Sequence, residues 1–111
     1  MSVIGWRMTV LAAAILTVAS AGASAQLSPG EQRGRAFALA NCARCHAIDK
    51  VSPSPLSLAP PFRTLHQRYP VETLDEALAE GIVTGHPSMP EFRLEPDQIG
   101  DFIAFLKSLE R

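Results

Sequence analysis

The chain has 111 residues, of which 47% are hydrophobic and 19% are charged, and its formal net charge at pH 7 is −1. This length allows one small domain, and the sequence has no internal repeat or low-complexity tract. The near balance of acids and bases argues against a nucleic-acid partner, which would require a basic patch.

Residues 1–25 have the order of parts of a secretory signal peptide. Arg7 precedes an apolar run over residues 8–18, and small residues follow up to Ala23-Ser24-Ala25, an A-x-A cleavage pattern. We therefore expect cleavage after Ala25 and a single mature domain over residues 26–111. An uncleaved membrane anchor stays open, although the apolar stretch is marginal for a bilayer, which needs roughly 20 apolar residues.

The first helix of the mature chain is predicted to begin after Ser28. Ser28 and Glu31 form a capping box, and Pro29 suits the first helical position. The helix should end at about Asn41 or Cys42.

The next residues, Cys42-Ala43-Arg44-Cys45-His46, form the C-x-x-C-H signature for covalent attachment of a c-type haem. Each thiol can add to one porphyrin vinyl group, and the adjacent histidine then supplies an axial iron ligand. A thioredoxin-like dithiol expects a nearby βαβ pattern, which the sequence lacks. A zinc site would have only His66 and His86 to complete it, and a disulfide would close a very small loop.

The rest of the chain predicts loops and two more helices, so the fold class is all-α. Residues 49–69 contain four prolines and should be mostly loop, and residues 85–90 form a Gly/Pro loop. A second helix is expected over residues 71–80, stopped by Gly81. The last helix should run over residues 96–109, because apolar residues recur there at helical spacing: Ile99, Phe102, Ile103, Leu106 and Leu109.

Met89 is the candidate for the second iron ligand. It is the only methionine after residue 25, and it lies in a proline-flanked loop rather than in a helical stripe. A thioether is a soft ligand suited to ferrous iron, and it raises the reduction potential. His86 is the main rival, and His66 the lesser one, for a bis-histidine site.

This order of parts resembles the class I cytochromes c, most closely the small single-haem periplasmic cytochromes c of proteobacteria. The resemblance covers essentially all of residues 26–111. It implies three main helices around one covalently attached haem, with the N- and C-terminal helices crossing. It also implies a periplasmic location, because c-type haem is attached on the outer side of the energy-transducing membrane.

The family's helix crossing can be carried over residue by residue. A glycine on the first helix there packs against an aromatic residue of the last helix, and Gly34, eight residues before the first cysteine, matches it. Phe102 and Phe105 match the last-helix side. The place of the usual first-helix aromatic residue holds Ala38, with Phe37 one position earlier, so the contact departs from the family pattern.

The family also implies further residues at the haem. A proline carbonyl accepts a hydrogen bond from the free ring nitrogen of the ligand histidine, and Pro60 is the candidate here, with Pro61 as the alternative. Arg63 and Tyr69 are candidate donors to the haem propionates. An ordinary surface arginine and a core-edge tyrosine are the alternatives for these two.

The expected function is one-electron transfer by a monomeric carrier with His46 and Met89 on the iron. A membrane cytochrome complex, an oxidase or a periplasmic dehydrogenase would be the partner, with no membrane contact unless the N-terminal segment is retained. The chain has only two lysines, Lys50 and Lys107, so docking should rely on an apolar surface around the haem edge. A haem enzyme or gas-binding protein with a labile Met89 is the alternative, and a fixed dehydrogenase subunit is a third.

Overall fold

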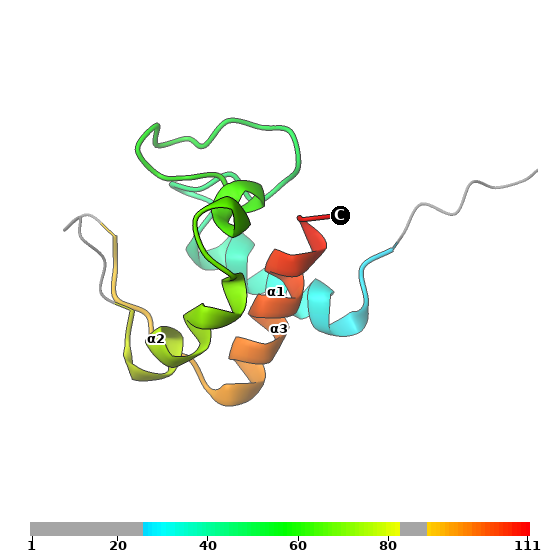
Figure 1. The fold of residues 1–111 in the computed structure, drawn as a ribbon, viewed down its shortest axis with the longest axis vertical. Coiled ribbons are helices and arrows are strands. Elements are labelled where there is room, and N and C mark those ends of the chain that lie inside the picture. Colours follow the sequence, from blue (N-terminus) through cyan, green and yellow to red (C-terminus); the bar gives the residue numbers. More distant parts are fainter. Residues whose placement is uncertain (1–25, 83–88) are drawn as a thin grey trace, which may run out of the picture.

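In the computed structural model, residues 26–82 and 89–111 are described, and the expected signal peptide lies outside them. The described part is all-α, as predicted, without a strand. None of its helices is both long and apolar enough to cross a membrane. Its elements are α1 (Pro29–Asn41), the 3-10 helices η1 (Phe62–Gln67) and η2 (Val71–Thr73), α2 (Leu74–Glu80) and α3 (Pro96–Ser108) (Figure 1).

Local signals fix the ends of these helices. The Ser28 hydroxyl accepts from the Glu31 N–H at 3.2 Å, and the Glu31 carboxylate accepts from the Ser28 N–H at 2.9 Å, so the predicted capping box is confirmed. Gly81 ends α2 with a φ of 107°, a conformation that side chains other than glycine rarely adopt. Capping and backbone freedom are local properties, which is why the sequence predicts the bounds of α1 and α3 and the end of α2 closely. The expected start of the second helix at residue 71 is wrong, because Val71–Thr73 form the 3-10 helix η2 and α2 begins at Leu74.

The prediction of loop over residues 49–69 is wrong for its last third. Residues Phe62–Gln67 form the 3-10 helix η1, which begins after Pro61. Phe62 and Leu65 are both buried, and their spacing of three residues matches the three-residue turn of a 3-10 helix. Pro61, the last proline of the predicted loop, is therefore the residue directly before this short helix.

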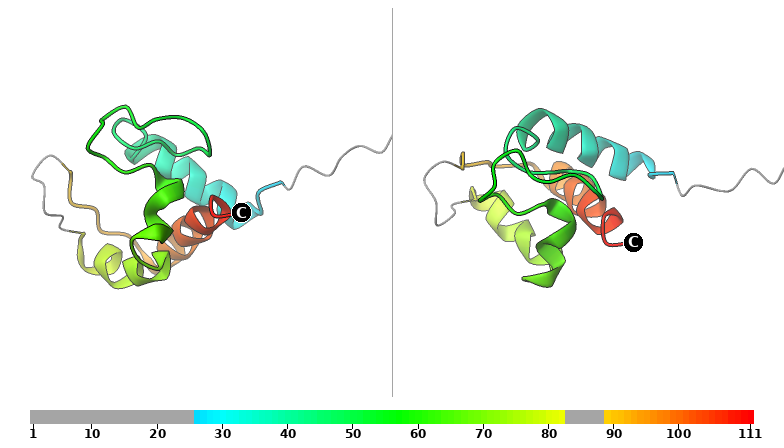
Figure 2. Two further views of the ribbon diagram at one scale, coloured as in Figure 1. Left: turned by 45° about the horizontal axis from the view of Figure 1, so that its top comes forward. Right: turned by 90° about the horizontal axis from the view of Figure 1, so that it is seen from above.

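The two end helices, α1 and α3, cross in close contact (Figure 2). Gly34 lies at the crossing, where an added Cβ would collide with the Asp101 carbonyl oxygen and lie 2.8 Å from Cβ of Phe105. Directly before Gly34, Arg33 makes a two-pronged ion pair with the Asp101 carboxylate at 2.7 and 2.9 Å. The close approach expected at Gly34 is thus present.

The close approach at Gly34 changes which residues of α3 are buried. Phe105, outside the predicted stripe, is 1% exposed because it faces α1, whereas Ile103 and Leu109 are only partly buried. Phe37 replaces the missing family aromatic residue, with its ring edge-on to Phe102 at 5.4 Å between centroids. The crossing therefore has the glycine and aromatic contacts expected from the family, with the aromatic residue of the first helix one position earlier in the sequence.

A turn at Asp49 orders the loop that follows the C-x-x-C-H motif. Its carboxylate accepts from the backbone N–H groups of Val51 and Ser52 at 2.8 and 2.6 Å and from the Ser52 hydroxyl at 2.6 Å. These hydrogen bonds, with a smaller contribution from the charge of the nearby Arg63, lower the pKa of Asp49 to about 2. Arg63 also donates to the Ser52 carbonyl at 2.7 Å, which ties the turn to η1.

Gly34 and Gly100 allow a matched test of the helix crossing. Replacing a mid-helix glycine by alanine gains roughly 0.5–1 kcal/mol in helix propensity. Nothing lies within 4 Å of a Cβ at Gly100, so Gly100→Ala should stabilise the protein by that amount. Gly34→Ala should destabilise it by about 1–3 kcal/mol, because the helices must move apart. Urea unfolding of the holoprotein measures both, and equal effects would contradict the close approach.

The Asp49 turn predicts a pH dependence of stability. The lowered pKa means that the ionised carboxylate stabilises the folded state above the ordinary value of 3.8, and that this contribution is lost as the pH falls towards 2. Asp49→Ala should therefore unfold at lower urea concentration than wild type at pH 7, and the difference should shrink as the pH falls towards 2, because the protonated carboxyl keeps an acceptor but loses its charge. Asp49→Asn, which keeps an acceptor, should lie between them. A difference that persists unchanged at pH 2 would rule out the charge as its source.

Candidate functional site

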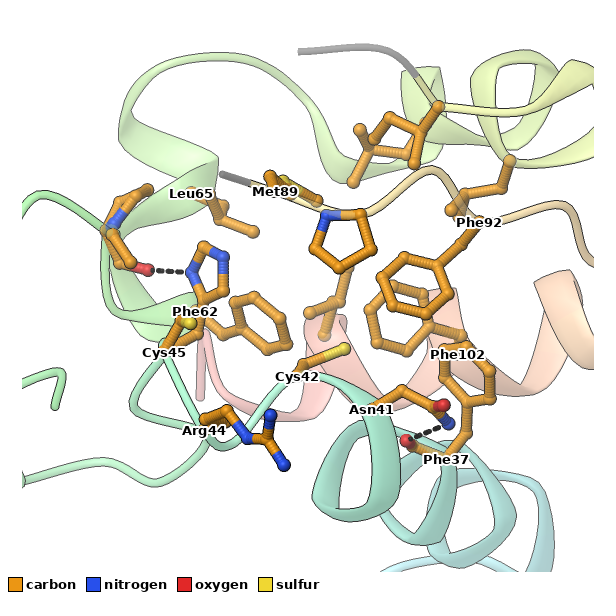
Figure 3. A pocket seen from close by; sticks show the side chains of 18 of the residues that line it. Phe37, Asn41, Cys42, Arg44, Cys45, Phe62, Leu65, Met89, Phe92 and Phe102 are labelled. Atoms are coloured by element: carbon orange, nitrogen blue, oxygen red, sulfur yellow. Dashed lines mark hydrogen bonds between the residues drawn. The ribbon is translucent and has the colours of Figure 1, made fainter. Parts of the chain in front are cut away.

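A cavity of about 570 Å³ lies between the helices and the 49–61 loop (Figure 3). Its volume is within the roughly 300–1,000 Å³ typical of ligand pockets. The end of α1, the C-x-x-C-H motif, η1, α2, α3 and the segment that begins at Met89 all contribute to its wall. Six of the seven predicted site residues line it, namely Cys42, Cys45, His46, Pro60, Tyr69 and Met89.

Cys42 and Cys45 bring two free thiols to the cavity. Burial raises the pKa of the Cys42 thiol to about 11. A redox dithiol requires the opposite, since its attacking cysteine works as a thiolate with a lowered pKa. The pair is therefore unsuited to thioredoxin-like chemistry, and its thiols are not joined to each other.

His46 is 8% exposed, and its ring is held by a backbone carbonyl. The ring atom Nδ1 lies 2.8 Å from the carbonyl oxygen of Pro60. A carbonyl oxygen can only accept, so Nδ1 carries the proton of the neutral ring, and Nε2 keeps its lone pair for a metal ion. Of the two prolines considered from the sequence, Pro60 makes this contact.

Within residues 26–82 and 89–111, the charged residues that line the cavity are arginines. They are Arg44, from within the motif, and Arg68, after η1, and no aspartate or glutamate of these two ranges lines the wall. Tyr69 lies next to Arg68, and partial burial raises the pKa of its phenol, whose O–H can donate a hydrogen bond. Two arginines and a phenol suit a ligand that carries carboxylates.

Arg63, predicted as a propionate donor, is not among the lining residues. Its guanidinium donates instead to the carbonyl oxygens of Ser52 at 2.7 Å and Asp49 at 3.4 Å. The path of the loop decides this, because the Asp49 turn brings two carbonyl groups to the start of η1. Arg44 and Arg68 are the arginines that the structure places at the cavity.

Sequence reasoning missed Arg68, although the signal is present in the chain. Phe62, Leu65 and Arg68 recur every third residue and all three line the cavity. This spacing places side chains on one face of a 3-10 helix. Predicting η1 as a loop hid that face.

Met89 is partly buried and lines the cavity, and Figure 3 shows it entering from the other side than Cys42 and Cys45. Of the two rival histidines, His66 is exposed on η1 and is not a lining residue, whereas His86 lies outside the described residues. In residues 26–82 and 89–111, no group of three His, Cys, Asp or Glu side chains could hold a metal ion, so the zinc hypothesis finds no support there.

These residues fit a haem. The two free thiols would bond the vinyl groups, and the imidazole with its available Nε2 would bind the iron. The mostly apolar walls would contact the porphyrin ring, and the two arginines would pair with the propionates. When bound, the haem supplies an iron that changes between the ferrous and ferric states.

Comparison with known proteins agrees with this fit. The sequence matches the family described as Cytochrome c over residues 31–110, from the first turn of α1 to beyond the end of α3. No curated protein and no solved structure matches the chain. The match spans both crossing helices and the C-x-x-C-H motif, and therefore the chain belongs to the cytochrome c family, with a haem c bound covalently through Cys42 and Cys45 and with haem-based electron transfer as its chemistry.

Proposed function

We propose that the protein is a monomeric, periplasmic one-electron carrier in which His46 and Met89 are the two axial ligands of the haem iron. The observation that carries this proposal is that His46, with Nδ1 bonded to Pro60, and Met89 both line the same cavity. A second axial ligand closes the iron to small molecules, which suits a carrier rather than an enzyme.

The chain's own residues set the conditions for this role. The Pro60 carbonyl fixes which nitrogen of His46 is free and increases its basicity as a ligand. The thioether of Met89 favours ferrous iron. The buried rings of Phe62 and Phe102 add apolar surface to the cavity wall. The haem held by these residues would supply the one-electron couple between a donor protein and an acceptor.

The periplasmic location rests on the signal-like order of residues 1–25. In that compartment the donors and acceptors for such a carrier are membrane cytochrome complexes, oxidases and soluble dehydrogenases. The partner would dock on the face where exposed apolar side chains border the cavity. Leu58 is 86% exposed and Leu56 and Tyr69 are about a third exposed, and all three line the cavity.

Arg44 and Arg68 at the same wall would offset the charges of the two propionates. The docking face would then be close to neutral with an apolar centre. Such a face fits an apolar patch on the partner better than a strongly acidic one, because long-range steering requires a concentrated field.

Met89→Ala tests the ligand assignment. Loss of the thioether should lower the reduction potential, since methionine raises it, and should open the iron to carbon monoxide. Redox titration and the carbon monoxide difference spectrum measure both effects. Pro90→Ala is the control, because it alters the neighbouring residue and keeps the thioether. If Met89→Ala keeps the wild-type potential and excludes carbon monoxide, another residue is the ligand.

Electron self-exchange tests the docking face without a known partner, because two copies must meet through the faces that expose their haem edges. Leu58→Asp should slow self-exchange by about tenfold, which corresponds to about 1.4 kcal/mol, since two carboxylates would enter an apolar contact. Leu39→Asp is the matched control, because Leu39 is 57% exposed on α1 and does not line the cavity. NMR line broadening in mixtures of the two redox states measures the rate. Equal effects of the two substitutions would exclude this face.

A further inference from the structure

Three hydrogen bonds hold the segment that contains His46 against the segment that contains Pro60. His46 Nδ1 bonds to the Pro60 carbonyl at 2.8 Å, and the Phe62 N–H donates to the Ala47 carbonyl at 2.9 Å. The Ala47 N–H in turn donates to the Ser54 hydroxyl at 3.0 Å. Ala47, the residue after His46, is therefore bonded through both its N–H and its carbonyl to the stretch that runs from Ser54 to Phe62.

The hydrogen bond alone does not fix the plane of the imidazole ring. Hydrogen bonds tolerate deviations of tens of degrees from linearity before they weaken steeply. The ring can therefore tilt about the Nδ1 contact unless something lies against its face. Phe62 lies there, with its centroid 4.8 Å from that of His46 and its plane tilted by 34°.

Phe62 is itself held in place. It is 6% exposed, and its ring meets Phe102 of α3 nearly at right angles, with 5.8 Å between the centroids. Phe102 meets Phe37 of α1 in the same manner at 5.4 Å. A chain of aromatic contacts thus runs from His46 through Phe62 and Phe102 to Phe37 of α1, so Phe62 is held from the side away from the imidazole.

We infer that Phe62 is a positioning residue that sets the plane of the His46 imidazole, and thereby tunes the electronic state of the haem iron. This inference rests on the proposed role of His46 as an iron ligand. The plane of an axial imidazole decides which iron d orbital interacts with its π electrons, so a tilt changes the magnetic anisotropy of ferric iron and the reduction potential.

The test replaces the ring and leaves the apolar volume. Phe62→Leu and Phe62→Met both remove the flat face that lies against His46, and methionine fills irregular gaps if leucine does not allow folding. Both should shift or broaden the g values in the electron paramagnetic resonance spectrum of the ferric holoprotein and change its reduction potential. Phe62→Tyr keeps the ring and should restore wild-type g values.

Two controls separate positioning from general damage to the core. Phe105→Leu removes a phenyl ring that is 1% exposed and does not line the cavity, so it should lower stability and leave the g values unchanged. Phe92→Leu removes a phenyl ring that lines the cavity and pairs with Phe37 rather than His46.

Unchanged g values in both Phe62→Leu and Phe62→Met, or an equal shift in Phe92→Leu, would overturn the inference. The wild-type spectrum distinguishes this failure from failure of the proposed function. A low-spin wild-type spectrum with an inert Phe62 defeats only the role of Phe62, whereas a high-spin wild-type spectrum defeats the ligand assignment itself.

Discussion

The close crossing of α1 and α3 at Gly34 is the constraint on which the rest of the molecule depends. It joins the two ends of the domain, so the chain between α1 and α3 must leave the crossing and come back to it. The end of α1 carries Cys42 to the cavity, and the inner face of α3 supplies Phe102 and Leu106 to its wall. A wider crossing would move the thiols away from the wall that faces them. Because a small domain has a thin core, a covalently attached haem between these walls is a substantial part of that core.

Two different kinds of interaction act at the cavity, one on the porphyrin and one on the ligand histidine. Covalent bonds from Cys42 and Cys45 fix the position of the porphyrin, whereas the Pro60 carbonyl and the Phe62 ring fix the orientation of His46. The 49–61 loop is the element that makes the second kind possible. Three interactions bring the Pro60 carbonyl within reach of the His46 ring. They are the turn at Asp49, the hydrogen bond from the Leu56 N–H to the Cys45 carbonyl at 3.1 Å, and the hydrogen bond from the Ala47 N–H to the Ser54 hydroxyl. Arg63 serves this loop rather than the ligand, which accounts for its position away from the cavity.

What the sequence predicts well here is local. The capping box at Ser28, the stop at Gly81 and the C-x-x-C-H motif each depend on a few adjacent residues, so their outcome does not require the path of the whole chain. The helical stripe of the last helix leaves out Phe105, which only the family's crossing pattern predicts, because its burial depends on the nearness of α1 at Gly34. The role of Arg63 depends on the Asp49 turn, which the sequence does not predict. Pro60, the candidate from the sequence, makes the contact with His46, whereas the Pro61 carbonyl accepts from the Thr64 N–H at 3.0 Å.

The proposal that His46 and Met89 close the iron can be tested with a single spectrum. The measurement is the optical absorption of the purified holoprotein in both redox states, with and without carbon monoxide. We expect a low-spin spectrum, a near-infrared band from the sulfur-to-iron bond in the ferric form, and no change on adding carbon monoxide. A high-spin spectrum, or ready binding of carbon monoxide to the wild-type protein, would contradict it and favour a ligand-binding or enzymatic role.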